Sequence, residues 1–150
     1  MKKSAGILLY RKNPQVEVFL CHPGGPFYKN KDNGVWTIPK GEFEDEDPLD
    51  AAKREFHEET GQVIAGRFIE LTPVKYKDGR KTVYAWAVEG TIDTAAIVSN
   101  VLDLEWPPRS GSTVRVPEVD RGDWFTVPAA RKKILPSLMP LLDEFEQLEF

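Results

Sequence analysis

The sequence has 150 residues, 41% hydrophobic and 29% charged, which suits one globular domain with a sizeable core. Its net charge of −4 argues against a nucleic-acid-binding protein, for which a basic surface is expected. No segment is apolar enough to span a membrane, residues 1–20 lack a signal-peptide pattern, and a single cysteine, Cys21, excludes an intrachain disulfide. We therefore expect a soluble cytoplasmic protein with one domain over residues 1–150, and no membrane or nucleic-acid partner.

The first forty residues predict a hairpin followed by a long loop. Residues 4–10 are continuously apolar and predict a buried strand, which pairs with a second strand at residues 16–20. Residues 22–34 are rich in Gly, Pro and Asn and predict a surface loop, in which His22 is expected to be solvated. The loop carries side chains suited either to contacts with a nucleobase and phosphates or to ordinary loop packing: Phe27, Tyr28, Lys29 and Lys31. Residues 35–38 predict a short strand.

A helix is predicted between Asp47 and Gly61. Asp47 is a favoured N-cap, Pro48 suits the first helical position, and Gly61 is the expected left-handed terminator. Spacings of three and four residues place one apolar set on the face that packs on the core: Leu49, Ala52 and Phe56. Three carboxylates share another face: Glu55, Glu58 and Glu59. Because crowded carboxylates repel one another, this face is either a site for a hard divalent cation or a solvated surface.

The second half of the chain predicts more strands than helices. Residues 63–71 predict a strand with a kink at Gly66. The Asp78-Gly79 turn joins strands at residues 74–76 and 82–88, the second apolar on both faces and therefore central. Residues 98–115 have no clear pattern beyond a loop at residues 106–111. A strand at residues 124–125, a short helix at residues 128–135 and an amphipathic helix after Pro136 complete an α+β fold.

The segment around the predicted helix follows a recognisable spacing. The pattern opens with Gly41 and Glu46, and seven residues separate Glu46 from the Arg54-Glu55 pair. Four further residues then follow in register: Phe56, Glu58, Glu59 and Gly61. This pattern resembles the Nudix box. Two features depart from it. Only four residues separate Gly41 from Glu46, one fewer than usual, and Gln62 stands where the box has an apolar residue, with Val63 one position later. The shorter loop could alter how Gly41 presents its backbone.

The resemblance implies an α/β/α sandwich around a mixed β-sheet and an active site that uses Mg²⁺, with Mn²⁺ as a possible substitute. It implies four metal ligands: the side chains of Glu55, Glu58 and Glu59 and the backbone carbonyl of Lys40. Arg54 is expected to pair with a box glutamate and orient it; the alternative for Arg54 is an ordinary surface ion pair. Glu46 is expected to brace the loop; the alternative for Glu46 is a solvated acidic residue.

Members of the Nudix family differ in which residue acts as the general base. Here the base is either a box glutamate, Glu58 or Glu59, or a later carboxylate. Among later residues Glu118 is preferred to Glu105, because it precedes Trp124 at a spacing similar to that in the dinucleoside-tetraphosphate hydrolases; a turn carboxylate after Pro117 is the alternative. Three residues are expected to contact substrate, through phosphate or base: Lys40, Phe27 and Tyr28.

These assignments predict a Nudix hydrolase that directs water at a phosphoanhydride bond of a nucleoside diphosphate linked to another group. The Pro-Lys-Gly-Glu segment at residues 39–42 and the run at residues 46–49 favour a dinucleoside polyphosphate as substrate. Nucleoside triphosphates are the alternative substrates, and a nucleotide sensor without hydrolytic activity is the alternative function. Oxidised-purine triphosphates, nucleotide sugars and capped RNA are less favoured.

Overall fold

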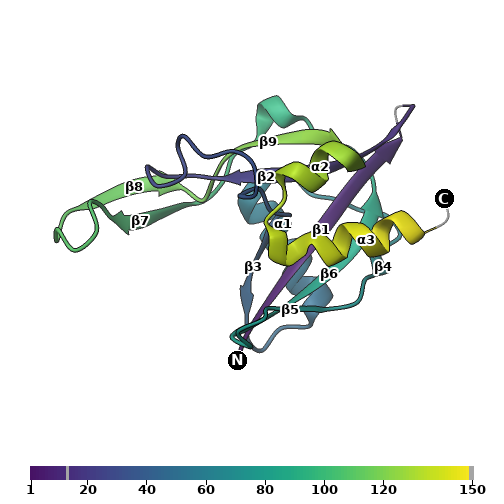
Figure 1. The fold of residues 1–150 in the computed structure, drawn as a ribbon, viewed down its shortest axis with the longest axis horizontal. Helices are drawn as coiled ribbons and strands as arrows, with labels where there is room; N and C mark the ends of the chain where they lie inside the picture. The colour runs from purple at the N-terminus through teal and green to yellow at the C-terminus, as the bar shows by residue number, and fades with distance from the viewer. Residues whose placement is uncertain (13, 149–150) are drawn as a thin grey trace.

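The computed structural model describes residues 1–12 and 14–148. Within them, seven strands form one mixed sheet in the order β4-β6-β1-β2-β9, with β3 also paired to β1 and β5 to β6 (Figure 1). The strand bounds are Lys2–Lys12 for β1, Val16–Pro23 for β2, Lys40–Phe43 for β3, Ile69–Glu70 for β4, Val74–Lys75 for β5, Lys81–Glu89 for β6 and Val119–Thr126 for β9. The β1–β6 pair is parallel and the other pairs are antiparallel.

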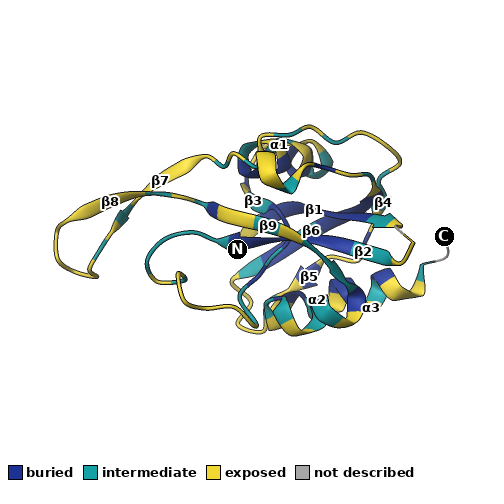
Figure 2. Cartoon of the chain, turned by 90° about the horizontal axis from the view of Figure 1, so that it is seen from above, coloured by how far each residue is buried: buried dark blue, intermediate teal, exposed yellow. Residues whose placement is uncertain are grey.

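Helices cover both faces of this sheet (Figure 2). Helix α1, Pro48–Thr60, lies on one face, and α2, Val127–Lys133, and α3, Met139–Gln147, lie on the other. Two short 3₁₀ helices, η1 at Thr94–Ala96 and η2 at Pro136–Leu138, belong to the connections. The predicted α+β class and the α/β/α sandwich are therefore confirmed.

The sheet is buried on both faces because successive side chains of a strand point in opposite directions. On β1, Ile7 and Leu9 pack with Phe56 of α1, whereas Leu8 and Tyr10 belong to the core on the side of α2 and α3. These β1 side chains are at most 5% exposed. Helix α1 is thus fixed to the sheet by its apolar face, which leaves its carboxylate face for the site.

The ends of α1 form as their residues predict. The Asp47 side chain accepts a hydrogen bond from the Asp50 amide at 3.2 Å, and Pro48 occupies the first turn. Gly61 adopts φ 75° and its amide donates to the His57 carbonyl at 2.8 Å. The hairpin of β1 and β2 and the Asp78-Gly79 hairpin of β5 and β6 are also confirmed.

In the second half of the chain one prediction is wrong, and one stretch left unassigned has regular structure. Most of residues 63–71 is irregular, and only Ile69–Glu70 forms a strand. The unassigned residues 98–115 contain a hairpin of β7, Val101–Glu105, and β8, Thr113–Pro117, which projects from the main sheet (Figure 1). Its strands are mostly exposed, yet their residues alternate: Leu102 and Leu104 with Asp103 and Glu105 on β7, and Val114 and Val116 with Thr113 and Arg115 on β8. The hairpin could therefore have been predicted from this alternation. No helix of the described residues is both long and apolar enough to span a bilayer.

Candidate active site

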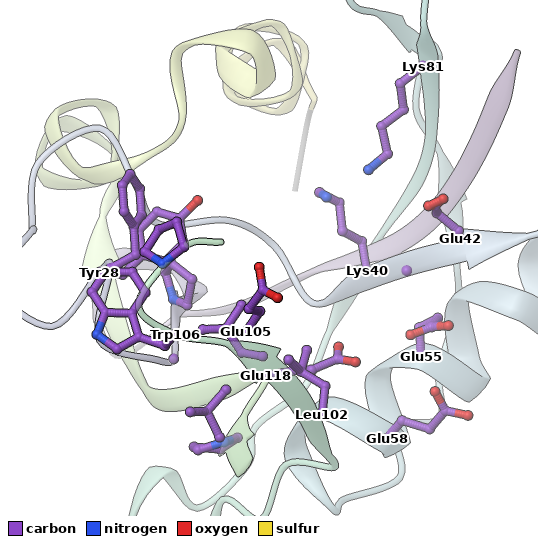
Figure 3. A pocket seen from close by; sticks show the side chains of 18 residues that line it. Tyr28, Lys40, Glu42, Glu55, Glu58, Lys81, Leu102, Glu105, Trp106 and Glu118 are labelled. Atoms are coloured by element: carbon purple, nitrogen blue, oxygen red, sulfur yellow. The ribbon is translucent and has the colours of Figure 1, made fainter. Parts of the chain in front are cut away.

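A cavity of about 740 Å³ lies where three parts of the chain meet: the β3–α1 unit, the loop after β2, and the β7–β8 hairpin. One side is ionic and carries Lys40, Glu42, Glu55, Glu58, Lys81 and Glu118 (Figure 3). The other side is largely apolar and carries Phe27, Tyr28, Leu102, Leu104, Trp106 and Val116. Most of the predicted site residues therefore share one cavity, and the two that do not line it are Arg54 and Glu59.

The α1 carboxylates are held by Arg54. Its Nη1 donates to Glu55 Oε1 at 2.9 Å and to Glu58 Oε1 at 3.0 Å, and its Nε donates to both carboxylate oxygens of Glu46 at 3.1 and 3.0 Å. Glu46 therefore fastens the β3–α1 loop to the helix through Arg54. These contacts are those expected if Arg54 orients the glutamates and Glu46 braces the loop.

Strand β3 contacts the third α1 carboxylate, Glu59, and also packs against Glu55. The Lys40 amide donates to Glu59 Oε2 at 2.8 Å, which ties the first residue of β3 to the last turn of α1. Glu55 packs directly over Gly41, where an added Cβ would lie 2.1 Å from the Glu55 carboxyl carbon. A glycine at position 41 is therefore needed for the carboxylate to reach this place, and the short loop to Glu46 does not prevent the contact.

Glu55 and Glu59 are buried, with 7% and 6% of their surface exposed. Burial, reinforced by repulsion from Glu118, raises the pKa of Glu59 to about 8. Burial and then Glu58 likewise raise the pKa of Glu55, although Arg54 opposes the shift. The charged forms of these carboxylates thus lack a sufficient counter-charge in the protein itself.

The chemistry of this donor set fits a hard divalent cation, because desolvated carboxylate oxygens and a nearby backbone carbonyl are ligands that Mg²⁺ and Mn²⁺ accept. Among the described residues no three carboxylate, imidazole or thiol groups stand together as a finished metal site. Arg54 instead bridges Glu55 and Glu58. Arg54 occupies only the Oε1 atom of each carboxylate, so the Oε2 atoms of Glu55 and Glu58 are the oxygens that could contact a cation while both side chains keep Arg54.

Glu118 lies in the turn between β8 and β9, and its carboxylate faces the α1 carboxylates (Figure 3). Its amide donates to the Asn100 carbonyl at 3.0 Å, and its carbonyl accepts from the Gly24 amide at 3.0 Å. The Asn100 amide in turn donates to the Glu58 carbonyl at 2.8 Å. Asn100, in the segment that the sequence left unassigned, therefore joins Glu118 to α1.

Glu105 also lines the cavity, but its Oε1 accepts from the Arg109 amide at 2.8 Å.

The apolar side of the cavity is aromatic. Phe27 and Tyr28 contact each other edge to face at 4.8 Å between ring centroids, and the Lys31 ammonium lies 3.5 Å from the Phe27 centroid. Trp106, at the end of the β7–β8 hairpin, lies on the same side as Tyr28 (Figure 3). Trp106 could not be assigned from the sequence, because only the hairpin brings it beside the loop.

Lys40 and Lys81 point toward each other on the ionic side (Figure 3). Burial, followed by the charge of Lys81, lowers the pKa of Lys40 to about 8. The sequence placed Lys40 in the site but missed Lys81. Lys81 is the first residue of β6, and the parallel pairing of β6 with β1 brings it to the cavity.

The prediction for His22 is wrong. His22 belongs to β2, because that strand continues to Pro23, and its side chain is 0% exposed. Its Nδ1 lies 2.8 Å from Asp120 Oδ1 and its Nε2 lies 2.7 Å from the Lys31 carbonyl oxygen. His22 therefore ties the loop after β2 to β9. His57 is exposed on α1, as expected.

Residues 1–145 match the family described as the NUDIX domain. The chain belongs to this family. It is 30% identical over 119 residues to an 8-oxo-(d)GTP phosphatase of Mycolicibacterium smegmatis; the match covers 71% of this chain but only 34% of that protein, so the chain spans about a third of the relative's length. The family match confirms the predicted membership of the Nudix family.

Several solved structures match the fold of this protein over nearly the whole chain. The Caenorhabditis elegans Ap4A hydrolase in a binary complex has a TM-score of 0.66 at 20% identity, over 96% of both chains. The NUDIX domain of Shewanella oneidensis NrtR complexed with ADP ribose has a TM-score of 0.66 at 15% identity, over 97% of this chain and 86% of the other. At these identities the likeness shows the fold.

Proposed function

We propose that this Nudix protein is a Mg²⁺-dependent hydrolase that cleaves a phosphoanhydride bond in a nucleotide, with a dinucleoside polyphosphate as the favoured substrate. The observation that carries the proposal is the cavity itself. Glu55, Glu58 and Glu118 face it on one side, and Tyr28 and Trp106 face it on the other (Figure 3). Phosphates and a nucleobase of one ligand can therefore contact both kinds of side chain at once.

Each site residue has a proposed role. Glu55, Glu58, Glu59 and the Lys40 carbonyl would hold Mg²⁺ or Mn²⁺, which supplies positive charge against the phosphate oxygens when bound. Glu118 is the proposed general base, since its carboxylate faces the ligand set without belonging to α1, and such a base contributes about 10²–10⁴-fold in rate. Arg54 orients Glu55 and Glu58. The Lys40 side chain contacts a phosphate, and Phe27 and Tyr28 contact a base.

Two relatives bear on the substrate. The fold of the C. elegans Ap4A hydrolase matches this chain nearly end to end, which supports a dinucleoside polyphosphate. The M. smegmatis relative supports the alternative of a nucleoside triphosphate, including the oxidised purine nucleotides that the sequence disfavoured. A sensor without hydrolytic activity is disfavoured because Glu55, Glu58 and Glu59 are all present, and the first two line the cavity.

We further propose that the protein acts as a single domain in the reducing cytoplasm, on a small nucleotide and not on nucleic acid. Cys21 is free and buried, which suits a compartment in which thiols stay reduced. The cavity is bounded on its apolar side by a narrow projecting hairpin and not by a basic surface, which supports a small ligand.

The test is hydrolysis of a nucleotide panel that includes diadenosine tetraphosphate, nucleoside triphosphates and ADP-ribose, with Mg²⁺ and with EDTA. The wild type should release product only with Mg²⁺. Glu58→Gln and Glu59→Gln should each lower the rate about 10²-fold or more, because each removes a proposed ligand. Glu70→Gln, the same change at an exposed residue of β4, is the matched control. Equal rates in all four proteins would refute the metal site.

A further inference from the structure

Asn100 lies between the proposed general base and the helix that carries the proposed metal ligands. Its amide donates to the Glu58 carbonyl at 2.8 Å, and its carbonyl accepts from the Glu118 amide at 3.0 Å. Its side chain adds a third contact, because Nδ2 donates to Glu118 Oε1 at 3.4 Å. A carboxylate only accepts hydrogen bonds, so the side-chain nitrogen of Asn100, and not its oxygen, faces Glu118. Asn100 therefore contacts both the backbone and the carboxylate of Glu118.

The backbone that carries the Asn100 side chain is fixed on two sides. Two residues earlier, the Val98 amide donates to the carbonyl of Thr60, the last residue of α1, at 3.0 Å. The Ser99 hydroxyl donates to the Asn100 carbonyl at 2.9 Å and accepts from the amide of Val119, the first residue of β9, at 3.0 Å. The segment of residues 98–100 is thus hydrogen-bonded to the end of α1 and to the start of β9.

Glu118 needs a donor because the charges near it repel it. Its carboxylate faces the α1 carboxylates (Figure 3), and burial followed by the charge of Glu118 raises the pKa of Glu59. Within the described residues, no lysine or arginine forms an ion pair with Glu118. A half-buried carboxylate that is repelled from one side turns toward solvent unless a donor holds it. The Asn100 side chain is neutral, so it can hold Glu118 without neutralising its charge.

We propose that Asn100 is a positioning residue, whose side chain holds one oxygen of Glu118 toward the α1 carboxylates and leaves the other oxygen to accept a proton from water. The inference rests on the proposed function, in which Glu118 is the general base, but the contact itself can be tested without turnover. Asn100 does not line the cavity, so it acts through Glu118 and not on the substrate. A lysine in its place would also hold Glu118 but would weaken it as a base, because a nearby positive charge favours the ionised carboxylate.

The first test measures melting temperatures in EDTA as a double-mutant cycle. Asn100→Asp replaces the donor by a carboxylate of the same shape that repels Glu118, so its melting temperature should lie about 2–4 °C below that of Asn100→Ala. In the Glu118→Ala background this difference should shrink by about half or more, because the repelled partner is missing. Asn33→Asp and Asn33→Ala make the same changes at an exposed loop residue, and their difference should not depend on Glu118. An Asn100 difference of the same size in both backgrounds overturns the contact.

The second test measures kcat and KM for the best substrate of the nucleotide panel. Asn100→Ala should lower kcat about tenfold and leave KM within about twofold, because the base is misplaced while the cavity lining is unchanged; Asn33→Ala should change neither. In the Glu118→Gln background Asn100→Ala should lower kcat no further, since it acts through Glu118.

An unchanged kcat in Asn100→Ala, or an equal loss in both backgrounds, overturns the inference. A melting cycle that shows the coupling in a protein that hydrolyses no nucleotide would instead sustain the contact between Asn100 and Glu118 and refute the proposed function.

Discussion

At the scale of single residues, Glu59 shows most clearly that burial disfavours a charged carboxylate in this site. It is almost fully buried, and its Oε2 has a backbone donor, the Lys40 amide, at 2.8 Å. Even with that donor, burial and the charge of Glu118 raise its pKa from 4.5 to about 8. The folded state therefore holds a proton on Glu59 more firmly than the unfolded state, unless a cation takes the place of that proton.

This shift predicts a pH dependence of the metal-free protein. Because the folded pKa is raised, the contribution of Glu59 to stability is fully present below about pH 4.5 and is lost as the pH rises through about 8. Melting temperatures in EDTA should therefore fall between pH 5 and 8. Glu59→Gln should reduce that fall, since the amide does not titrate and its oxygen can still accept from Lys40, whereas Glu70→Gln should not. A fall of equal size in Glu59→Gln would contradict the assignment.

At the scale of elements, the site depends on contacts between segments far apart in the sequence. His22 links β2, β9 and the loop that carries Phe27 and Tyr28, through Asp120 and the Lys31 carbonyl. The His22 ring also lies edge to face with Trp36, 5.1 Å between centroids. The loop is therefore anchored at its base even though Phe27 itself is 52% exposed.

Replacing His22 should weaken the fold. His22→Leu leaves the Asp120 carboxylate and the Lys31 carbonyl without their partner, which should cost about 2–3 kcal/mol of unfolding free energy. His57→Leu makes the same change on the exposed face of α1 and should stay within about 0.5 kcal/mol of the wild type. Urea denaturation measures both values. If the two variants lose the same stability, His22 does not anchor the loop.

At the scale of the whole molecule, the sequence predicted what local spacing encodes. The α1 helix, its caps, the two main hairpins and the clustering of Glu55, Glu58 and Glu59 all follow from residues close together in the chain. Lys81, Asn100 and Trp106 could not be placed in this way. Lys81 and Asn100 reach the cavity through the β1–β6 pairing and a backbone bridge to α1, which leave no local pattern. The β7–β8 hairpin that carries Trp106 does leave an alternating pattern, but its place beside the loop after β2 does not.

Pairing between distant strands also explains why the prediction of a solvated His22 is wrong. Composition marked residues 22–34 as a loop, but pairing with β9 extends β2 to Pro23 and buries the imidazole. Long-range pairing thus decided where an apparently exposed polar residue lies. The single-domain organisation and the catalytic roles of the site residues stay predictions.

The proposed activity requires a divalent cation bound by the α1 carboxylates, and Mn²⁺ binding followed by electron paramagnetic resonance tests this most directly. The wild type should bind Mn²⁺, and Mg²⁺ should displace it. Glu58→Gln and Glu59→Gln should each weaken binding about tenfold or more, whereas Glu70→Gln should bind as the wild type does. Unchanged Mn²⁺ affinity in both Glu58→Gln and Glu59→Gln would contradict the proposed site.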